Sequence, residues 1–232
     1  SEVKQGITRA TNQAGDSLAG IGLDTWAIDF GLLDRQGALI GNPYNYRDSR
    51  TDGMLEEAFR RMPRQQIFEL TGIQFMQINT LYQLLSMVVS QSPALERAQT
   101  FLTIPDLLNY WLTGRAVCEF TNATTTQCYD PRRRAWSEPL LEAMGIPRSI
   151  FPEVIPPGSL LGPLSEWIAA EIGCAAPVIA PATHDTGSAV AAVPSATPGF
   201  AWISSGTWSV VGTELPEPVI SASSLAYNFT NE

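Results

Sequence analysis

Histidine and cysteine are scarce in this chain of 232 residues, which contains one histidine and three cysteines. The cysteines, Cys118, Cys128 and Cys174, are widely spaced, and the sequence has no CxxC or HxxxH pair for a metal or redox site. An odd number of scattered cysteines is typical of a reducing, intracellular compartment. We therefore expect a cytoplasmic protein whose own residues form no metal site.

Long apolar runs and an excess of positive charge are also missing. No stretch approaches the roughly 20 apolar residues of a membrane-spanning helix, and the N-terminus lacks the apolar core of a signal peptide. The net charge of -9 is opposite to that of proteins that bind polyanions through clustered Lys and Arg. The one basic run, 132–134, lies in a predicted surface turn. We expect neither nucleic acid nor a membrane as partner, and nothing in the sequence indicates an oligomeric state.

Lysine and arginine are absent from residues 149–232, although the two segments most like ligand sites lie there. These are PATHDTGSAV at 181–190 and SSGTWS at 204–209. A phosphate group bound here must be held by backbone N–H groups, hydroxyls and a metal ion. Gly206 and Thr207 suit such a loop, because glycine permits close backbone approach. A plain hairpin turn with exposed hydroxyls would show the same pattern.

Apolar patterning predicts an α/β fold for this 44% hydrophobic chain, in one large domain or one and a fraction. Residues 18–34 are apolar and β-prone, and with the short segment after them they predict two or three strands in a meander. The middle of the chain is predicted to be mostly helical, with Thr51 or Asp52 capping its first helix. The predicted helices lie at about 51–62, 64–71, 80–91, 105–113, 137–144 and 164–172.

The strand pattern returns near the end of the chain. Val178–Ala180 predicts a short strand, which is followed by a polar loop and a helix of small residues. Open α/β sheets place ligands at such strand-to-helix turns. Residues 200–215 predict a β-hairpin with a Gly-centred turn. The predicted fold class is therefore α/β, with a helical insertion between two sheet-forming regions.

His184, the only histidine, is followed by Asp185 at the start of this predicted helix. Three roles are open for Asp185. As a helix N-cap it would accept backbone N–H bonds, and as a general base it would take a proton from a substrate hydroxyl. As a member of a hydrolase triad it would need a nucleophile. The triad is the weakest of the three, because the chain has no GxSxG elbow.

Three further polar features invite interpretation. Asp24 and Asp29 lie five residues apart in a strand-rich segment, so strand alternation would place them on opposite faces and they form no carboxylate pair. Trp26 is either a platform for a sugar ring or a buried core residue. Segment 121–127, TNATTTQ, either lines a polyol site or forms a loop whose hydroxyls bond its own backbone.

Eight segments from residue 18 to the end of the chain match, in the same order, the motifs of one known family. They are GLDTWAIDFGLLD, YRDSRTDGM, TGIQFMQINTLYQL, LTIPDLLNYWLTG, TNATTTQ, ATHDTGSAV, SSGTWSVVG and NFTNE. Taken together they resemble the rhamnulokinases, a group within the FGGY carbohydrate kinases. The DTW, RDSRT and SSGTWS pieces favour the rhamnulokinases over glycerol and xylulose kinases.

The resemblance implies a fold of two actin-like (ribonuclease H-like) α/β domains with the active site between them. Sugar binds on the first domain and ATP largely on the second. Residues 1–195 would form the sugar-binding first domain without its N-terminal hairpin, and residues 196–232 the start of the ATP-binding second domain. The implied reaction transfers the γ-phosphoryl group of ATP to the C1 hydroxyl of L-rhamnulose, in L-rhamnose catabolism.

The resemblance also implies roles for individual residues. Asp185 would be the catalytic proton acceptor, and ATP would bring its phosphates together with Mg²⁺. Ala27 departs from the family pattern, which has glycine there, and the added methyl group bears on which ketose fits. The implied sugar-contacting residues are Ala27, His184, Asp185 and Thr186, and the implied ATP-binding residues are Gly206 and Thr207.

The family pattern extends beyond this sequence at both ends. Its opening Asp-Leu-Gly-Ala-Ser-Ser-Gly-Arg loop has no counterpart before Ser1, and its sequence continues past Glu232. The resemblance thus implies a fragment of an active kinase that is inactive by itself. The alternatives are an isolated, non-catalytic sugar-binding module and a kinase for another ketose.

Overall fold

Short helices and strands follow one another along residues 1–14, 18–195, 197 and 199–232, which the computed structural model describes. None of the described helices is long and apolar enough to cross a membrane. The helices are α1 (Glu2–Ala14), α2 (Met54–Arg61), α3 (Arg64–Thr71), α4 (Thr80–Val89), α5 (Pro93–Arg97), α6 (Ile104–Thr113), α7 (Phe120–Thr125), α8 (Glu138–Met144), α9 (Glu166–Ile172), α10 (Asp185–Ala191) and α11 (Ala222–Ala226). The strands are β1 (Ile21–Gly22), β2 (Phe30–Leu33), β3 (Thr100–Thr103), β4 (Cys118–Glu119), β5 (Tyr129–Asp130), β6 (Ala135–Trp136), β7 (Val154–Ile155), β8 (Ser159–Pro163), β9 (Pro177–Ala180), β10 (Ala201–Ser205) and β11 (Ser209–Thr213).

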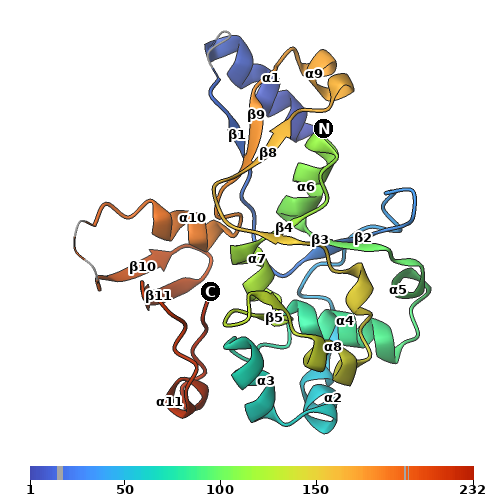
Figure 1. Ribbon diagram of the computed structural model, residues 1–232, viewed down its shortest axis with the longest axis vertical. Helices are drawn as coiled ribbons and strands as arrows, with labels where there is room; N and C mark the ends of the chain where they lie inside the picture. The colour runs from blue at the N-terminus through green and yellow to red at the C-terminus, as the bar shows by residue number, and fades with distance from the viewer. Residues whose placement is uncertain (15–17, 196, 198) are drawn as a thin grey trace.

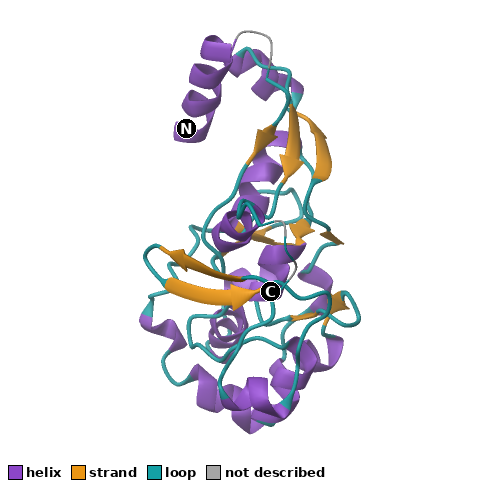
Figure 2. Cartoon of the chain, turned by 90° about the vertical axis from the view of Figure 1, so that its left-hand side faces the viewer, coloured by secondary structure: helices purple, strands orange, loops and turns teal. Residues whose placement is uncertain are grey.

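These elements lie along one long axis (Figure 1). Helices α1 and α9 and the sheet of β1, β9 and β8 occupy one end, and helices α2, α3 and α8 occupy the other (Figure 2). The β10–β11 hairpin projects sideways from the middle, next to α10.

The sheet that leads to the candidate site has the strand order β1-β9-β8. Strand β9 is parallel to β1, with Ile21 opposite Val178, and antiparallel to β8. Ile21 and Val178 are buried in a small core that α9 and α6 complete through Ile168 and Leu112. Beyond the strands, Thr25 and His184 form an isolated parallel bridge. Two segments far apart in the sequence therefore leave the same edge of the sheet side by side.

A larger core lies among α2, α4, α8 and the antiparallel β2–β3 pair. Helix α4 is its centre, since Leu81, Tyr82 and Leu85 are fully buried and the helix is apolar on most sides. Phe101 of β3 adds a ring whose centroid lies 5.0 Å from that of Phe151. Each such side chain stabilises the fold by about 1.5–3 kcal/mol through burial. This core provides a rigid base for the segments that carry the site.

The helices predicted between residues 51 and 172 are confirmed, and their ends differ by at most three residues from those of α2, α3, α4, α6, α8 and α9. The predicted cap of the first helix is wrong. Asp48 caps a 3₁₀ turn at Ser49–Thr51, and the chain then enters α2 through Gly53, whose positive φ of 77° suits glycine. Segment 121–127, for which a loop was one of two interpretations, lies mostly in helix α7, which ends at Thr125.

The predicted meander after residue 18 is wrong for its first two strands, which do not pair with each other. Strand β1 pairs with β9 and β2 pairs with β3, and both partners are distant in the sequence. Between β1 and β2 the chain bends at Ile28, a β-branched residue with a φ of 69°, which is uncommon for a residue other than glycine. The turn and short strand expected after β2 are present: Leu39 forms an antiparallel bridge with Leu33, and the amide of Ile40 donates to the carbonyl oxygen of Leu32 at 2.9 Å. The predicted strand at Val178–Ala180 and the hairpin at 200–215 are confirmed as β9 and β10–β11.

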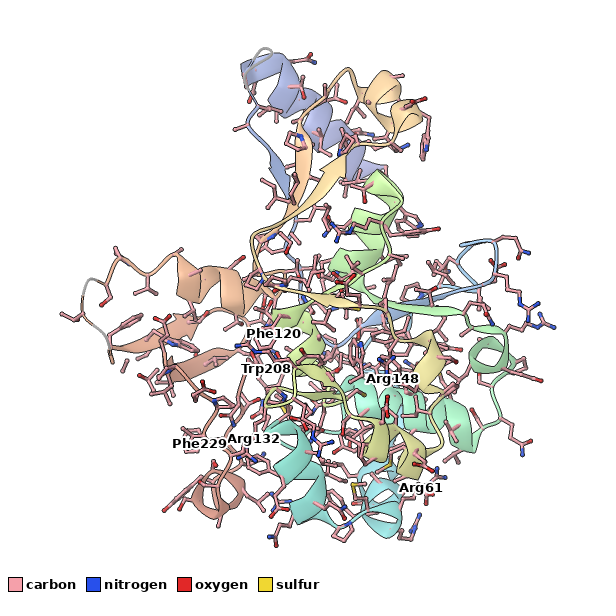
Figure 3. All side chains as sticks on the ribbon, in the orientation of Figure 1. Arg61, Phe120, Arg132, Arg148, Trp208 and Phe229 are labelled. Carbon is pink, nitrogen blue, oxygen red and sulfur yellow. The ribbon has the colours of Figure 1, made fainter. Side chains whose placement is uncertain are left out.

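The basic run lies in an exposed turn between β5 and β6, as predicted. Arg133 pairs with Asp130 at 3.7 Å. Arg132 donates to the carbonyl oxygen of Ile220 at 3.0 Å and so reaches the C-terminal segment (Figure 3). One arginine of this turn therefore binds the backbone at Ile220 and another is paired with an aspartate, so the turn presents no broad cationic patch.

Candidate active site

The Thr25–His184 bridge brings the candidate sugar-contacting residues together. The amide of Thr25 donates to the carbonyl oxygen of Thr183 at 3.0 Å, and the amide of Asp185 donates to that of Thr25 at 2.9 Å. Ala27 follows two residues after Thr25, and Thr186 follows Asp185 in the first turn of α10. Residues 27 and 184–186 therefore lie on neighbouring segments, as their predicted common role requires.

Asp185 presents its carboxylate to solvent, with 58% of the side chain exposed. It is the first residue of α10, and His184 occupies the N-cap position, because the amide of Ser188 donates to the carbonyl oxygen of His184 at 3.0 Å. The N-cap role considered for Asp185 is therefore wrong. One carboxylate oxygen accepts the amide of Thr186 at 2.7 Å. This exposed oxygen acceptor at a helix start has the chemistry of a proton acceptor.

His184 lies between two carboxylates. Its Nε2 is 3.4 Å from Oδ1 of Asp185, and its Nδ1 is 3.2 Å from Oε2 of Glu232. Burial by itself lowers the pKa of His184, but the negative charges of Glu232, Asp185 and Glu119 outweigh it and raise the pKa above its usual value. The imidazole therefore keeps its proton to higher pH than an exposed histidine does.

The C-terminal segment reaches His184 because asparagine side chains dock it on the end of α3. The side-chain oxygen of Asn228 accepts the amide of Phe75 at 2.8 Å, and the side-chain amide of Asn231 donates to the carbonyl oxygen of Gly72 at 2.9 Å. This docking leads directly to Glu232. No local sequence signal predicts it, although the motif NFTNE was part of the resemblance.

Trp26 is 47% exposed, so its interpretation as a buried core residue is wrong. Its indole N–H donates to Oδ2 of Asp29 at 2.9 Å, which orients the ring at the surface. Asp29 is buried, and burial raises its pKa, although hydrogen bonds from Trp26 and Gln83 and the charge of Arg50 act in the opposite direction. Asp24 is exposed, so the two aspartates form no pair, as predicted. An exposed, fixed indole near His184 is suited to pack on a sugar ring.

Glu119, which the sequence analysis missed, is the most buried carboxylate near the site. It accepts hydrogen bonds from Thr121 and from Thr183, the residue before His184. The hydroxyls of Thr124, Thr125 and Thr126 instead donate to carbonyl oxygens of their own helix turn. Of the two interpretations of 121–127, backbone bonding therefore describes these three hydroxyls.

Gly206 and Thr207 form the exposed turn between β10 and β11. The amide of Gly206 donates to the carbonyl oxygen of Trp208 at 2.9 Å. A Cβ atom added at Gly206 would meet nothing within 4 Å. The fold itself therefore does not require glycine here, and the turn leaves space for a ligand to approach the backbone.

No group of three or more His, Cys, Asp or Glu side chains that could hold a metal occurs among the described residues. The three cysteines are free and buried. A Mg²⁺ ion that arrives with a nucleotide needs only one or two carboxylates besides phosphate oxygens and water. Asp185, as an exposed carboxylate, fits that requirement.

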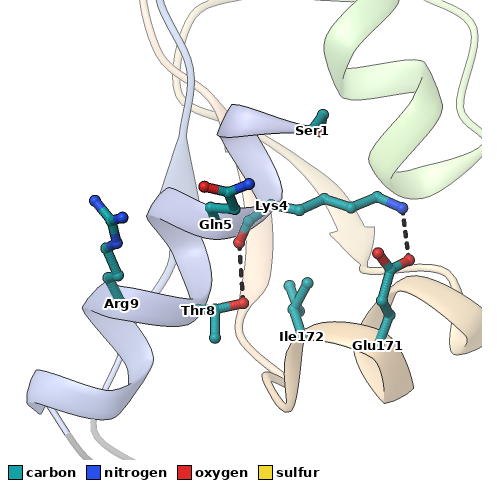
Figure 4. Close-up of a pocket in the computed structure, with 7 residues that line it drawn as sticks. All are labelled: Ser1, Lys4, Gln5, Thr8, Arg9, Glu171 and Ile172. Carbon is teal, nitrogen blue, oxygen red and sulfur yellow. Dashed lines mark hydrogen bonds and ion pairs between the residues drawn. The ribbon is translucent and has the colours of Figure 1, made fainter.

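A cavity of about 380 Å³ lies between α1 and α9, at the end of the molecule remote from the β10–β11 hairpin (Figure 1, Figure 4). The Lys4–Glu171 ion pair, at 2.6 Å, spans its rim. None of the predicted site residues line it; the lining residues are Ser1, Lys4, Gln5, Thr8, Arg9, Glu171 and Ile172.

Comparison with known proteins gives one family match and several relatives. Residues 1–192 match the N-terminal domain of the FGGY family of carbohydrate kinases. The chain is 44% identical over 231 residues to a rhamnulokinase from Oceanobacillus iheyensis, a match that covers 100% of this chain and 49% of that protein. A rhamnulokinase from Bacteroides thetaiotaomicron is 46% identical over 219 residues, covering 94% of this chain and 45% of that protein. The chain spans about half the length of the curated relatives it matches.

Solved structures resemble the chain in fold. A carbohydrate kinase from Novosphingobium aromaticivorans has a TM-score of 0.78 at 22% identity, covering 96% of this chain and 48% of that one. A xylulose kinase from Rhodospirillum rubrum also has a TM-score of 0.78, at 21% identity, covering 86% of this chain and 42% of that one.

Proposed function

Since the chain belongs to the FGGY family of carbohydrate kinases and has the predicted actin-like α/β fold, we propose that the protein phosphorylates a ketose with ATP. The relatives named rhamnulokinase support L-rhamnulose as the sugar. The C1 hydroxyl as the acceptor and a place in L-rhamnose catabolism are further parts of the proposal. The observation that carries the proposal is the Thr25–His184 bridge, which sets the segment of Trp26 and Ala27 beside an exposed Asp185.

Asp185 is the base in this proposal. It takes the proton of the sugar hydroxyl while the hydroxyl oxygen attacks the γ-phosphorus of ATP in line and the bond to the bridging oxygen of ADP breaks. His184 and Thr186 hold the sugar with Ala27, and Trp26 covers one face of the ring. Mg²⁺ would arrive with the nucleotide and would supply charge neutralisation at its phosphates, while Asp185 keeps its free carboxylate oxygen for the proton of the sugar hydroxyl.

The nucleotide side of the site is the turn of Gly206 and Thr207. Backbone N–H groups and the Thr207 hydroxyl would bind phosphate there, because residues 149–232 contain no lysine or arginine. The proposed boundary between a sugar-binding domain at 1–195 and the ATP-binding part at 196–232 is supported by the end of α10 at Ala191.

The proposed partners are thus a sugar and a nucleotide, with no nucleic acid or membrane. The net charge of -9 supports this. A cytoplasmic location is proposed because ATP is the phosphoryl donor, and the three free thiols agree with a reducing compartment. Ala27, where the family has glycine, supports a second candidate function, a kinase for another ketose.

The test is ATP-dependent phosphorylation of L-rhamnulose, D-xylulose and other ketoses, with ADP release followed continuously and the product identified by NMR. Asp185→Asn is expected to lower kcat by about 100-fold or more, the magnitude of general-base catalysis. Asp24→Asn, an exposed aspartate on the neighbouring segment, is the matched control and should retain activity. Turnover of no ketose would refute the kinase proposal, and sugar binding without nucleotide binding in calorimetry would favour the non-catalytic sugar-binding module.

A further inference from the structure

Glu119 is a fully buried carboxylate that only accepts hydrogen bonds. Its Oε1 accepts the amide of Thr121 at 3.0 Å. Its Oε2 accepts the hydroxyl of Thr121, together with the amide of Thr183 at 3.0 Å and the hydroxyl of Thr183 at 2.9 Å. Within the described part of the chain, no Lys, Arg or His lies within ion-pair distance of Glu119. Its negative charge is therefore compensated by four hydrogen bonds from two threonines, Thr121 next to it in the chain and Thr183 far along the chain.

Both threonine hydroxyls also accept a hydrogen bond from a further residue. The hydroxyl of Thr121 accepts the amide of His184 at 3.1 Å, and the hydroxyl of Thr183 accepts the side-chain amide of Asn122 at 2.8 Å. Each hydroxyl thus donates one bond to Glu119 and accepts one bond from a neighbour, which uses its hydrogen-bonding capacity consistently. We call Glu119, Thr121, Asn122 and Thr183 the Glu119 cluster.

The Glu119 cluster controls the backbone of the loop that leads into α10. The amide of Thr183 is bound by Glu119 and the amide of His184 by Thr121. The amide of Asp185 is bound from the opposite side by the carbonyl oxygen of Thr25. Three consecutive amides therefore have assigned acceptors, two of which belong to the cluster.

Asp185 depends on this backbone because its own side chain is mostly exposed and cannot be held by packing. Helix α7, which carries Thr121, lies close to α10: a Cβ atom added at Gly187 would lie 3.5 Å from the Cβ atom of Thr121. In Figure 1, α7 lies in the middle of the molecule, beside the loop that enters α10.

We propose that Glu119 is a positioning residue for the phosphoryl transfer: acting through Thr121 and Thr183, it sets the loop so that Asp185 and His184 face the sugar. This inference rests on the proposed function, since it assigns Asp185 as the base. Glu119 itself touches neither sugar nor nucleotide in this scheme. A misplacement of the base by about 1 Å can lower turnover about 100-fold, so a residue that holds the base in place has a large effect on the rate.

The alternative is that the Glu119 cluster only stabilises the fold. The two roles differ in what Thr121 must supply. Positioning requires its hydroxyl, which serine also has, whereas stabilisation by packing requires its methyl group, which valine also has. Thr125, on the same helix, is buried and donates only to the carbonyl oxygen of Asn122, so Thr125→Val is the matched control.

The experiment compares Thr121→Val, Thr121→Ser and Thr125→Val in the full protein, with hydrogen exchange of the amides of 182–186 and steady-state kinetics as readouts. Thr121→Val is expected to speed exchange of the His184 amide about 10-fold and to lower kcat/KM for the sugar by about 10- to 100-fold, with KM for ATP unchanged. Thr121→Ser should retain both values, and Thr125→Val should change neither.

Glu119→Gln extends the series, because any orientation of the amide sets its NH₂ group against an N–H donor of Thr121 or Thr183. It should change hydrogen exchange and kinetics in the same direction as Thr121→Val. If this variant fails to fold, the comparison of Thr121→Val with Thr121→Ser still tests the proposal. Equal losses in Thr121→Ser and Thr121→Val, or wild-type exchange and kinetics in Thr121→Val, would overturn the proposal. Lack of kinase activity in the wild-type protein would refute the proposed function alone, since the exchange measurement reports on the loop without turnover.

Discussion

Replacing Asp106 by asparagine is expected to stabilise the protein increasingly as the pH rises. Asp106 is buried in the first turn of α6, where it accepts the hydroxyl of Thr103 and, at 3.1 Å, the amide of Glu119. Burial raises its pKa from 3.8 to about 7; the bonds from Thr103 and the Glu119 amide oppose the rise, and the charge of Glu119 adds to it.

The sign follows from the two states. Below pH 4 the carboxyl is protonated both folded and unfolded, and it adds no pH dependence. Between about pH 4 and pH 7 the unfolded chain has lost this proton and the folded chain keeps it, so the free energy of unfolding falls by about 1.4 kcal/mol per pH unit. Between pH 5 and pH 7 the loss amounts to about 2 kcal/mol, since the folded carboxyl itself begins to ionise near pH 7. Asparagine can still bond both partners, because the Thr103 hydroxyl can also accept, and it has no such loss.

The assay is urea unfolding of the wild type and Asp106→Asn at pH 5, 6, 7 and 8. The informative quantity is the difference between the two free energies of unfolding, because titrating groups that do not interact with Asp106 cancel in it. That difference should grow in favour of Asp106→Asn up to about pH 7 and then level off. Asp24→Asn, at an exposed position, should show no such trend. A difference that stays constant from pH 5 to pH 8 would refute the reasoning.

Two further outcomes are expected. His184→Gln should destabilise the protein by about 1 kcal/mol at pH 5.5, because partly exposed ion pairs contribute little, and by less at pH 8.5. The direction follows from the raised pKa of His184: its contribution to the free energy of unfolding is present below the unfolded pKa and is lost as the pH rises through the folded pKa. Urea unfolding of both proteins at the two pH values measures this contribution. A destabilisation that grows with pH would contradict the reasoning. Gly206→Ala should change the free energy of unfolding by less than about 0.5 kcal/mol, as open surface positions do, and should raise KM for ATP several-fold. An unchanged KM for ATP would remove this turn from the nucleotide site.

Local signals predicted helices α2, α3, α4, α6, α8 and α9 well, and they missed the short helices α5, α7 and α11. Two kinds of signal carried the prediction: the apolar spacing along α4, and the glycines that end α3, α6, α8 and α9. Both signals act on residues within one or two helical turns. The same holds for the β10–β11 hairpin, whose turn and strands are contiguous. Helix formation depends on contacts three or four residues apart, so the sequence carries that information locally.

Strand pairing was predicted poorly, because it depends on partners far along the chain. Alternating apolar residues after position 18 are compatible with a meander, yet β1 joins β9 and β2 joins β3. The interpretation of Trp26 as a core residue failed for a related reason: its hydrogen bond to Asp29 and its exposure depend on the turn at Ile28, which no local propensity favours.

The sequence by itself determined the helical middle of the chain, the hairpin, and the motif that marks His184, Asp185 and Thr186 as the candidate site. Only the tertiary structure decided how this site is held. Thr183 meets Glu119 across 64 residues, and Thr25 joins the same loop from the beginning of the chain. A carboxylate on a short strand gives no local signal of such contacts, because its partners become neighbours only when the distant segments pack.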